Sequence, residues 1–370
     1  MRGMLFVVAS FALTVLCWGL YGPLLHEGQH QMSTVEGQYA RLLPFVCVGL
    51  AYFAVGVVAP IAWLQTRGEQ GHWTSRGALL SLGAGALGAL GALGIVMAFT
   101  FGGKPSYVMP LVFGGAPVVN SFVTIFLARK MKEIGPMFLA GLIIVVLGAV
   151  TVLIFKPADA AKPKADAAVA AKTDSAPDPA PEGIEDVVVE QTKEATKTAS
   201  NFLLQLLSIA TVVVCWGTYG PTLHKGQAAM DNSKMRPLLC VGISYFVIAV
   251  LGSELILSVY PENSHWDFTG AVWSLMAGAA GALGALGIIM AFNFGGKPVY
   301  VMPLVFGGAP VVNTFFTIVA KGQYNQINPL FWAGLIMVIA GAVIVLVFAP
   351  RGGPKKPAKK PAESAEPSPA

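Results

Sequence analysis

Ten apolar runs, each near the roughly 20 residues that an α-helix needs to cross a bilayer, follow one another along the chain. Short polar segments separate most of them, and a longer polar segment separates the fifth run from the sixth. The pattern predicts an all-α membrane protein with ten transmembrane helices in two groups of five. The predicted helices are 4–25, 42–64, 77–101, 105–128, 136–155, 201–222, 237–259, 270–294, 298–320 and 329–349.

The two groups of five are copies of each other. FGGKPSYVMPLVFGGAPVVN at Phe101–Asn120 returns as FGGKPVYVMPLVFGGAPVVN at Phe294–Asn313, and CWGLYGPLLHEGQ from Cys17 returns as CWGTYGPTLHKGQ from Cys215. Five is an odd number of crossings, so the second copy must enter the membrane in the opposite sense from the first. The sequence thus predicts two inverted five-helix repeats, a common build of secondary transporters, whose substrate site lies near the midplane.

The repeats divide the chain into two membrane domains, residues 1–155 and 201–350. The segment 156–200 between them is rich in Ala, Lys, Pro, Asp and Glu and lacks apolar periodicity, so we predict a disordered linker, with a helix near its end as the alternative. The basic, proline-rich tail 351–370 is predicted to be disordered for the same reason.

Composition and charge agree with a membrane protein, because only 12% of residues are charged against about 25% in soluble domains. The net charge of +5 comes largely from Lys and Arg beside apolar runs, where they set orientation, so we expect no nucleic-acid partner. Fifteen of the 24 Lys and Arg lie on the side that holds both termini, and six of the others lie in the linker. Both termini are therefore predicted to be cytoplasmic and linker 156–200 outside, in a bacterial-type plasma membrane.

Chemistry typical of an enzyme is missing from the sequence pattern. It shows no Ser/His/Asp arrangement, no phosphate-binding loop and no metal-ligand cluster, so we expect no catalytic residue, no metal and no cofactor. The four cysteines lie inside apolar runs and are expected to be small buried hydrophobic residues. They are Cys17, Cys47, Cys215 and Cys240.

A WG pair in the first helix of each copy, a glycine-rich third helix and a proline-containing fourth helix make the chain resemble the drug/metabolite transporter superfamily, of the EamA-like type. The CWGxYGPxLHxGQ pattern and the fourth helix are most similar to the glucose, ribose and rhamnose porters. The resemblance covers both membrane domains. It implies transport of a small polar solute, with proton coupling in some members and export in others. The long charged linker and the near-identity of the halves depart from the usual pattern.

The fourth and ninth helices carry the candidate solute site. Their Gly-Gly-Ala-Pro segments fall near the midplane, where a proline leaves a backbone carbonyl unpaired, so we predict a helix break facing a polar cavity; a kink that only shapes packing is the alternative. The candidate break residues are Gly114, Gly115, Pro117, Gly307, Gly308 and Pro310. Polar residues follow on one helical face and are candidates for binding solute, namely Asn120 with Thr124 and Asn313 with Thr317.

Aromatic residues on the first helix of each copy are expected to line the same site. Trp18 and Tyr21 share one face of the helix, and Trp216 and Tyr219 repeat the arrangement. Aromatic faces with polar tips suit stacking against a sugar or a base, and an interfacial aromatic belt is the alternative.

The FGGKP corners before the fourth and ninth helices are predicted to be tight turns that open the next helix at proline. One corner lies outside and the other inside, as alternating gates require; lysine snorkelling at the interface is the alternative. The candidate gate residues are Gly102, Gly103, Lys104, Gly295, Gly296 and Lys297. His26 and His224 are expected just beyond the first helix of each copy, as loop or gate histidines.

Glycine recurs every three residues in the third and eighth helices, from Gly85 to Gly94 and from Gly278 to Gly287. Small residues let helices approach closely in lipid, so we expect tight packing along these faces.

Together these features predict a secondary transporter that moves a small, neutral, sugar-like solute by alternating access, with the solute and the lipid bilayer as partners. Glu254, the one carboxylate well inside a predicted span, is a candidate for proton coupling, which would make the protein a symporter. A shift of one helical turn would place Glu254 at the interface instead. The alternatives are a metabolite exporter of the same superfamily and a membrane scaffold that acts through its outer linker.

Overall fold

The computed structural model describes residues 2–127, 129, 131–155, 184–294, 298–321 and 327–348. Regular structure in these ranges is helical, apart from one isolated pairing of Ser33 with Ser264, and ten helices result when α2 with α3 and α8 with α9 are each counted as one. The helices are α1 (Arg2–Gln31), α2 (Leu42–Phe53), α3 (Ala59–Thr66), α4 (Ser75–Thr100), α5 (Pro105–Leu127), α6 (Pro136–Ile154), α7 (Ile184–Ala229), α8 (Met235–Tyr245), α9 (Ser253–Val259), α10 (Phe268–Asn293), α11 (Pro298–Lys321) and α12 (Pro329–Phe348).

Several of these helices suit a bilayer. Within the described chain, seven are long and apolar enough to cross a membrane, and the described parts of α6 and α12 are apolar but shorter. Large apolar side chains also point outward, among them Phe126 at 70% and Phe268 at 83% exposure. Contact of such apolar side chains with lipid carries no free-energy penalty, whereas their exposure to water is unfavourable. The protein is therefore an integral membrane protein built of helices.

Each half packs against the other through contacts that occur twice. α1 packs along α10 and α11, and its counterpart α7 packs along α4 and α5. α2 lies against α10 as α8 lies against α4, and the counterparts α6 and α12 pack against each other. The repeat in sequence is thus also a repeat of contacts, with the two halves exchanged.

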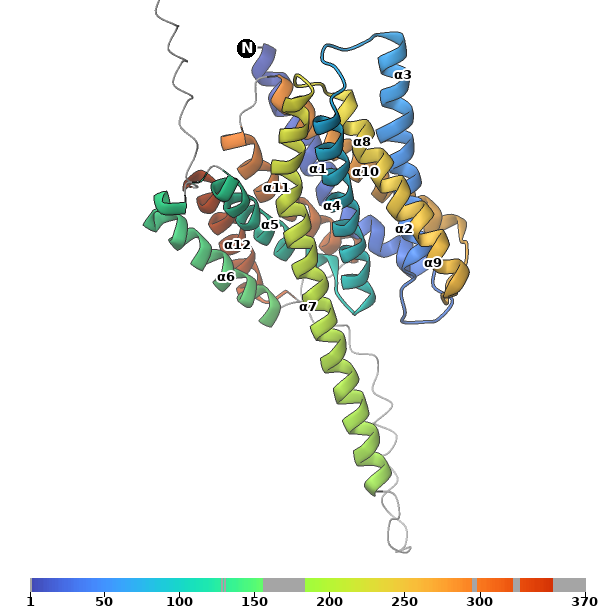
Figure 1. The fold of residues 1–370 in the computed structure, drawn as a ribbon. Coiled ribbons are helices and arrows are strands. Elements are labelled where there is room, and N and C mark those ends of the chain that lie inside the picture. The colour runs from blue at the N-terminus through green and yellow to red at the C-terminus, as the bar shows by residue number, and fades with distance from the viewer. Residues whose placement is uncertain are drawn as a thin grey trace, which may run out of the picture.

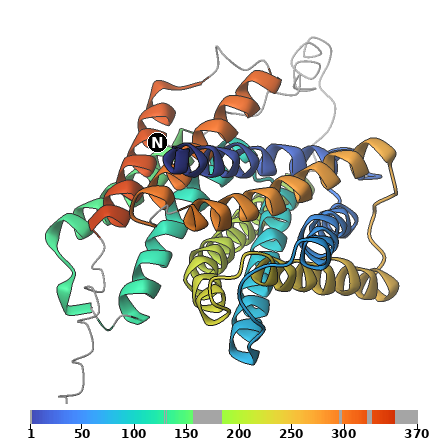
Figure 2. The same cartoon turned by 90° about the horizontal axis from the view of Figure 1, so that it is seen from above.

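Figures 1 and 2 show how the helices are grouped. α6 and α12 lie together at one edge of the bundle, and α2, α3, α8 and α9 lie at the opposite edge. The helices that carry the glycine stripes and the FGGKP corners stand between these two groups. α7 continues past the rest of the bundle at the end away from the N-terminus (Figure 1).

The start of α7 lies within the predicted linker, at the end where a helix was the alternative. α7 begins at Ile184, well before the predicted span at 201, so the last part of the expected disordered segment is helical. The reason is local: no Gly or Pro interrupts the sequence between Ile184 and Trp216, and nothing stops the transmembrane helix from extending. Residues 156–183 and 351–370 lie outside the described chain.

α1 and α7 also continue past residues 25 and 222, where the predicted spans end, and each contains a proline. α1 runs through Pro23 to Gln31, and α7 runs through Pro221 to Ala229. A proline removes one backbone hydrogen bond from a helix, and neighbouring helices can compensate for that loss in a membrane protein. The two histidines that follow the prolines therefore lie inside helices and not in loops.

The second helix of each half contains a π-helical stretch. Ala54–Val58 joins α2 to α3, and Phe246–Gly252 joins α8 to α9. Each begins within two residues of a tyrosine, Tyr52 or Tyr245. Such stretches are rare and often mark functional sites, so their presence at equivalent positions draws attention to the two tyrosines.

The N-termini of α2 and α8 are each capped by a carboxylate from the opposite half. Glu262 accepts a hydrogen bond from the backbone N–H of Leu42 at 2.9 Å, and Glu69 accepts one from the backbone N–H of Met235 at 3.1 Å. The first N–H groups of a helix have no partner within it, and these carboxylates supply one. Glu69 and Glu262 are themselves repeat equivalents, so the exchange of contacts extends to the helix ends.

The glycine stripes pack α4 and α10 against the other half, as expected. A methyl group added at Gly91 would overlap the indole ring of Trp216, and one added at Gly284 would overlap that of Trp18. Glycine is therefore required where α4 meets α7 and where α10 meets α1.

Candidate functional site

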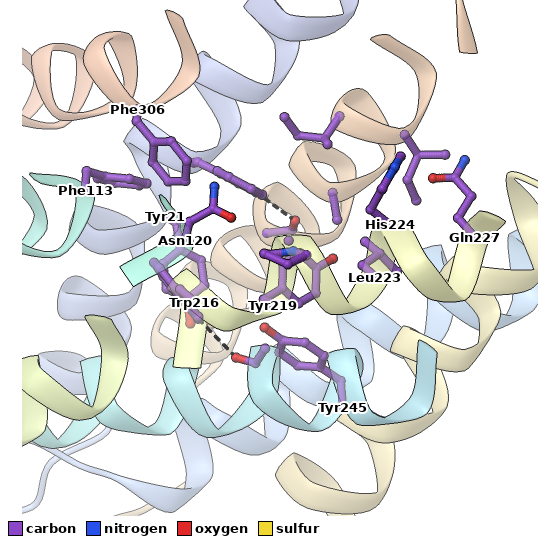
Figure 3. Close-up of a pocket in the computed structure, with 18 of the residues that line it drawn as sticks. Tyr21, Phe113, Asn120, Trp216, Tyr219, Leu223, His224, Gln227, Tyr245 and Phe306 are labelled. Atoms are coloured by element: carbon purple, nitrogen blue, oxygen red, sulfur yellow. Dashed lines mark hydrogen bonds between the residues drawn. The ribbon is translucent and has the colours of Figure 1, made fainter. Parts of the chain in front are cut away.

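A cavity of about 520 Å³ lies between the two halves, lined by residues of α1, α2, α4, α5, α7, α8, α10 and α11 (Figure 3). This volume falls in the range of about 300–1,000 Å³ that is typical of pockets for small molecules. Both halves of the chain contribute lining residues, so the cavity forms only when the two halves pack together.

Eight aromatic residues line the cavity, and they form four pairs of repeat equivalents. These pairs are Trp18 with Trp216, Tyr21 with Tyr219, Tyr52 with Tyr245, and Phe113 with Phe306. The structure thus brings together the Trp and Tyr residues that the sequence nominated, and it adds two pairs that the sequence did not.

Backbone carbonyls of the glycine stripes hold the two indole rings in place. The Nε1–H of Trp18 donates to the carbonyl of Gly281 at 3.3 Å, and the Nε1–H of Trp216 donates to the carbonyl of Gly88 at 3.2 Å. Both indole donors are therefore occupied within the protein. What each tryptophan can offer a ligand is its ring.

Polar side chains reach the cavity at one end, which we call the open end. It consists of Asn120 and Thr124 on α5 and His224 and Gln227 on α7. Thr124 and His224 are also exposed at the surface of the bundle, so the cavity communicates with the outside there. Figure 3 shows His224 and Gln227 away from the rings of Phe113 and Phe306.

The repeat equivalents of these four residues form the closed end. They are Asn313 and Thr317 on α11 and His26 and Gln29 on α1, and none of them lines the cavity. All four are buried, Asn313 and Gln29 completely. The candidate solute residues thus fall into two sets, because Asn120 and Thr124 face the cavity whereas Asn313 and Thr317 face packed protein.

Hydrogen bonds hold the closed end together. The Nδ2 group of Asn313 donates to the carbonyl of Pro105 at 2.8 Å, and the Oγ1 of Thr317 donates to the carbonyl of Asn313 at 2.8 Å. The Nε2 group of Gln29 donates to the carbonyls of Ala40 at 2.8 Å and Val96 at 3.1 Å. The amide nitrogens of Asn313 and Gln29 are thus occupied by backbone carbonyls, whereas their oxygens are buried without a hydrogen-bond partner among the described residues.

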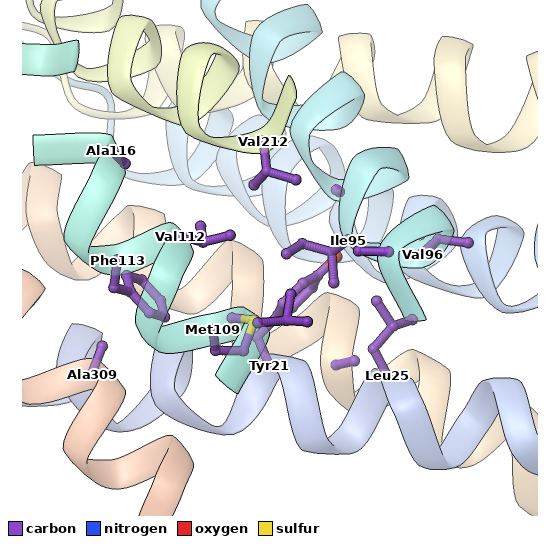
Figure 4. Close-up of a cluster of buried hydrophobic side chains, with 14 of the residues drawn as sticks. Tyr21, Leu25, Ile95, Val96, Met109, Val112, Phe113, Ala116, Val212 and Ala309 are labelled. Carbon is purple, nitrogen blue, oxygen red and sulfur yellow. The ribbon is translucent and has the colours of Figure 1, made fainter. Parts of the chain in front are cut away.

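Apolar side chains fill the rest of the closed end. Leu25, Val96 and Met109 belong to one buried cluster, in which α1, α4 and α5 converge (Figure 4). A methyl group at Gly22 would overlap Met109, whereas at the equivalent Gly220 the nearest described atom would be the Oδ1 of Asn120, 3.8 Å away. Glycine at position 22 therefore lets α1 and α5 approach closely at the closed end.

A loop residue covers the closed end. The ring of Tyr39 lies against His26, with ring centroids 4.9 Å apart. Burial raises the pKa of Tyr39, and the nearby charge of Glu27 adds to this effect, so the hydroxyl stays protonated at neutral pH.

The first FGGKP corner also lies at the closed end. Gly102 has a φ of +89°, which glycine adopts without strain, and its carbonyl accepts a hydrogen bond from the Tyr107 hydroxyl at 3.1 Å. Gly103 packs beneath the carbonyl of Ala98, and Lys104 is half-buried. The residues of the second corner, Gly295, Gly296 and Lys297, lie outside the described chain.

The predicted breaks in the fourth and ninth helices are not observed. α5 is continuous through Pro110 and Pro117, and α11 is continuous through its own Gly-Gly-Ala-Pro segment, which contains Gly307 and Pro310. Close packing explains the glycines of these segments. A methyl group added at Gly114 would overlap Val338. One added at Gly115 would lie 2.8 Å from Val213, and one added at Gly308 would lie 2.9 Å from Val15. The alternative of prolines within a packed, continuous helix describes these segments.

Glu254 does not face the cavity. It lies in the first turn of α9, where it is exposed on the surface of the bundle. Glu254 thus has no direct route to a solute in the cavity in this conformation.

No Asp, Glu, Lys or Arg lines the cavity within the described residues. The walls consist of aromatic and aliphatic side chains, and the open end supplies neutral amides, a hydroxyl and an imidazole. The described lining therefore offers no counterion to a charged ligand, and an unpaired ion in an apolar cavity is strongly disfavoured.

Sequence reasoning missed Tyr52, Tyr245, Phe113, Phe306 and Gln227. A single aromatic or amide residue in an apolar helix is ordinary and does not by itself indicate a binding site. A signal was present in the repeat itself, since every one of them has an identical residue at the equivalent position.

Comparison with known proteins gives information about the fold only. No family model matches this chain, and no curated protein matches it. Twelve chains of solved structures match, and one, a crystal structure of a protein with no function in its description, has a TM-score of 0.53 at 17% identity over 93% of this chain and 97% of that chain. At this identity the likeness shows a shared fold only. The chain is a multi-helix integral membrane protein with a solved structural counterpart of similar length.

Proposed function

We propose that this protein is a secondary transporter that moves a small uncharged solute across the membrane by alternating access. The observation that carries the proposal is the unequal state of equivalent residues around one cavity. The open end exposes an amide, a hydroxyl and an imidazole to the cavity, and the closed end packs the same groups away. Two nearly identical sequences in two different states are what a protein with two exchangeable conformations requires.

The proposal includes an inverted relation between the two halves. The exchange of contacts supports it, because α1 with α10 and α7 with α4 are related as the halves of an inverted repeat would be. With both termini cytoplasmic, as the Lys and Arg distribution favours, the open end faces the cytoplasm. The drug/metabolite transporter superfamily, with its importers and exporters, remains the relationship that the sequence favours.

The mechanism follows from exchanging the two ends. When the cytoplasmic end closes, Asn120 takes the role of Asn313 and donates to the carbonyl of Pro298, the equivalent of Pro105. Gln227 takes the role of Gln29 and turns from the cavity to backbone carbonyls. The aromatic pairs lie between the ends and stay in place, so solute remains bound while access changes sides.

Cysteine labelling in sealed membranes tests this proposal. In a variant without native cysteines, Thr124→Cys should react with a membrane-impermeant maleimide from the side of His224, and Thr317→Cys should react slowly and from the opposite side only. Tyr260→Cys, in an exposed loop at the closed end, is the control for sidedness. A Thr317→Cys variant that never reacts from either side, while Thr124→Cys and Tyr260→Cys react fully, would contradict alternating access.

A membrane scaffold is the second candidate, and the extension of α7 beyond the bundle favours it (Figure 1). Such a helix offers a partner a surface outside the membrane. Deletion of residues 160–195 separates the two functions, because a transporter tolerates the loss of a surface segment and a scaffold does not. Retained exchange of solute after deletion would exclude an essential scaffold role.

A further inference from the structure

We infer that the cavity takes an uncharged planar heterocycle that carries an amide-type polar edge, and not a monosaccharide. The inference rests on the proposed transport function for the step across the membrane, but it concerns the binding site itself. It follows from three properties of the lining, namely which donors are already used, where the remaining polar groups lie, and which charges are missing.

The aromatic walls offer surfaces and few hydrogen bonds. Both indole N–H groups donate to glycine carbonyls, so neither Trp18 nor Trp216 can donate to a ligand without breaking a bond in the protein. The tyrosine hydroxyls are the remaining polar groups of these walls, and that of Tyr21 has no hydrogen-bond partner among the described residues. A sugar would bring more hydroxyl groups than these can pair with, and each unpaired one would lose water without gaining a partner. A flat ring loses little on entering, because it has few polar groups and gains contact with the aromatic faces.

The open end supplies paired donors and acceptors. The side chains of Asn120 and Gln227 make no hydrogen bond to another described residue, although Gln227 is buried, with only 6% of its surface exposed. A carboxamide both donates and accepts, so it is satisfied by a ligand group that does the same. Amide, lactam and amidine edges of heterocycles meet that requirement, whereas an aliphatic or aromatic hydrocarbon does not.

The charges of the lining residues narrow the class of ligand further. No carboxylate or cationic side chain lines the cavity within the described residues, so an anion, or either end of a zwitterion, would be buried without a counterion. An organic cation would gain from the aromatic faces but would also lack a carboxylate. The ligand that leaves fewest groups unpaired is therefore neutral.

Equilibrium binding of radiolabelled probes to the purified protein tests the inference. The probes are adenine, uracil and nicotinamide as neutral planar heterocycles, D-glucose as a monosaccharide, choline as a cation and phenylalanine as a zwitterion. We expect binding of at least one heterocycle and none of the other three. Trp216→Ala and Asn120→Ala should each weaken heterocycle binding by about tenfold, as the loss of a stacking surface or a hydrogen bond to a buried group would.

Matched variants keep the result independent of folding. Trp216→Phe retains a ring and should bind more tightly than Trp216→Ala, and Phe126→Ala, at an exposed site on the same helix as Asn120, should bind as the parent protein does. Binding of D-glucose, choline or phenylalanine in place of the heterocycles would overturn the inference, as would failure of all three heterocycles.

Counterflow in proteoliposomes separates this inference from the proposed function. A heterocycle that binds and also exchanges across the membrane supports both. A heterocycle that binds with the expected dependence on Asn120 but never exchanges supports the site and overturns the transporter. D-Glucose that exchanges while no heterocycle binds supports the transporter and overturns the ligand class.

Discussion

The phenol rings of Tyr52 and Tyr245 stack with centroids 3.6 Å apart and planes within 2° of parallel. The two residues are repeat equivalents, so the chain places the same side chain face to face with its own copy. Both line the cavity, and each comes just before a π-helical stretch. This pair therefore marks the point where the two halves meet most symmetrically.

Replacement of either tyrosine should destabilise the protein through loss of the same contact. We expect Tyr52→Ala and Tyr245→Ala each to lower the melting temperature in detergent, and the double variant to show a coupling energy of about 0.5–1.5 kcal/mol. Tyr260→Ala, at a residue that is 73% exposed, serves as the control. Strictly additive effects in the two central variants would show that the stacked geometry contributes nothing.

The glycine stripes permit a matched test within one helix. Gly91→Ala introduces a methyl group where the Trp216 indole lies, and we expect a loss of about 1–3 kcal/mol in stability together with a distorted cavity. Gly83→Ala, on the same helix, meets no atom within 4 Å and should be neutral or slightly stabilising. Equal melting temperatures for the two variants would contradict the packing account.

Glu69 and Glu262 are predicted to stabilise the start of the second helix in the opposite half. Glu69→Ala or Glu262→Ala should cost about 0.5–2 kcal/mol, the usual effect of removing a helix cap. Glu36→Ala, at an exposed loop position, should change stability by less than about 0.5 kcal/mol. Thermal unfolding in detergent measures all three, and a smaller loss for Glu262 than for Glu36 would refute the capping role.

Gln29 and Gln227 should behave differently although their surroundings in sequence are alike. Gln29→Ala removes hydrogen bonds that hold the closed end, so we expect labelling of Thr317→Cys to increase by up to about tenfold. Gln227→Ala removes the group that would hold the cytoplasmic end closed in the other state, so it should lower that labelling and also weaken solute binding. The reverse pattern would mean that the open and closed ends have been assigned the wrong way round.

Glu254 tests whether proton coupling depends on a carboxylate outside the cavity. Because Glu254 is exposed in the first turn of α9, we expect Glu254→Gln to leave exchange and pH-driven uptake of solute unchanged. Abolished pH-driven uptake with intact exchange would instead assign a coupling role to Glu254.

The sequence predicted the all-helical membrane fold because apolar length and repetition are strong signals. The ten predicted spans coincide with the observed helices apart from their ends. The ends differ for physical reasons: α7 begins early because no Gly or Pro stops it, and α1 and α7 continue through proline because neighbouring helices support them.

The candidate site was only half predictable. Trp18, Trp216 and Asn120 were nominated from spacing on a helical face, and all three line the cavity. Asn313 is packed instead, although Phe101–Asn120 and Phe294–Asn313 differ only in that Val299 replaces Ser106. So small a difference in sequence does not predict which asparagine faces the cavity, because that depends on the conformation that the whole bundle adopts.

The carboxylate of Glu262 at the start of α2 has a consequence for the order in which the protein is made. The ribosome synthesises α2 long before Glu262, so α2 enters the membrane with the first backbone N–H groups uncapped. α8, in contrast, meets Glu69 as soon as it emerges, because Glu69 is already present. The cap of α2 can therefore form only after the second half has been synthesised, whereas the cap of α8 can form as soon as α8 emerges. The cap of α2 is complete only when the loop after α9 reaches the start of that helix.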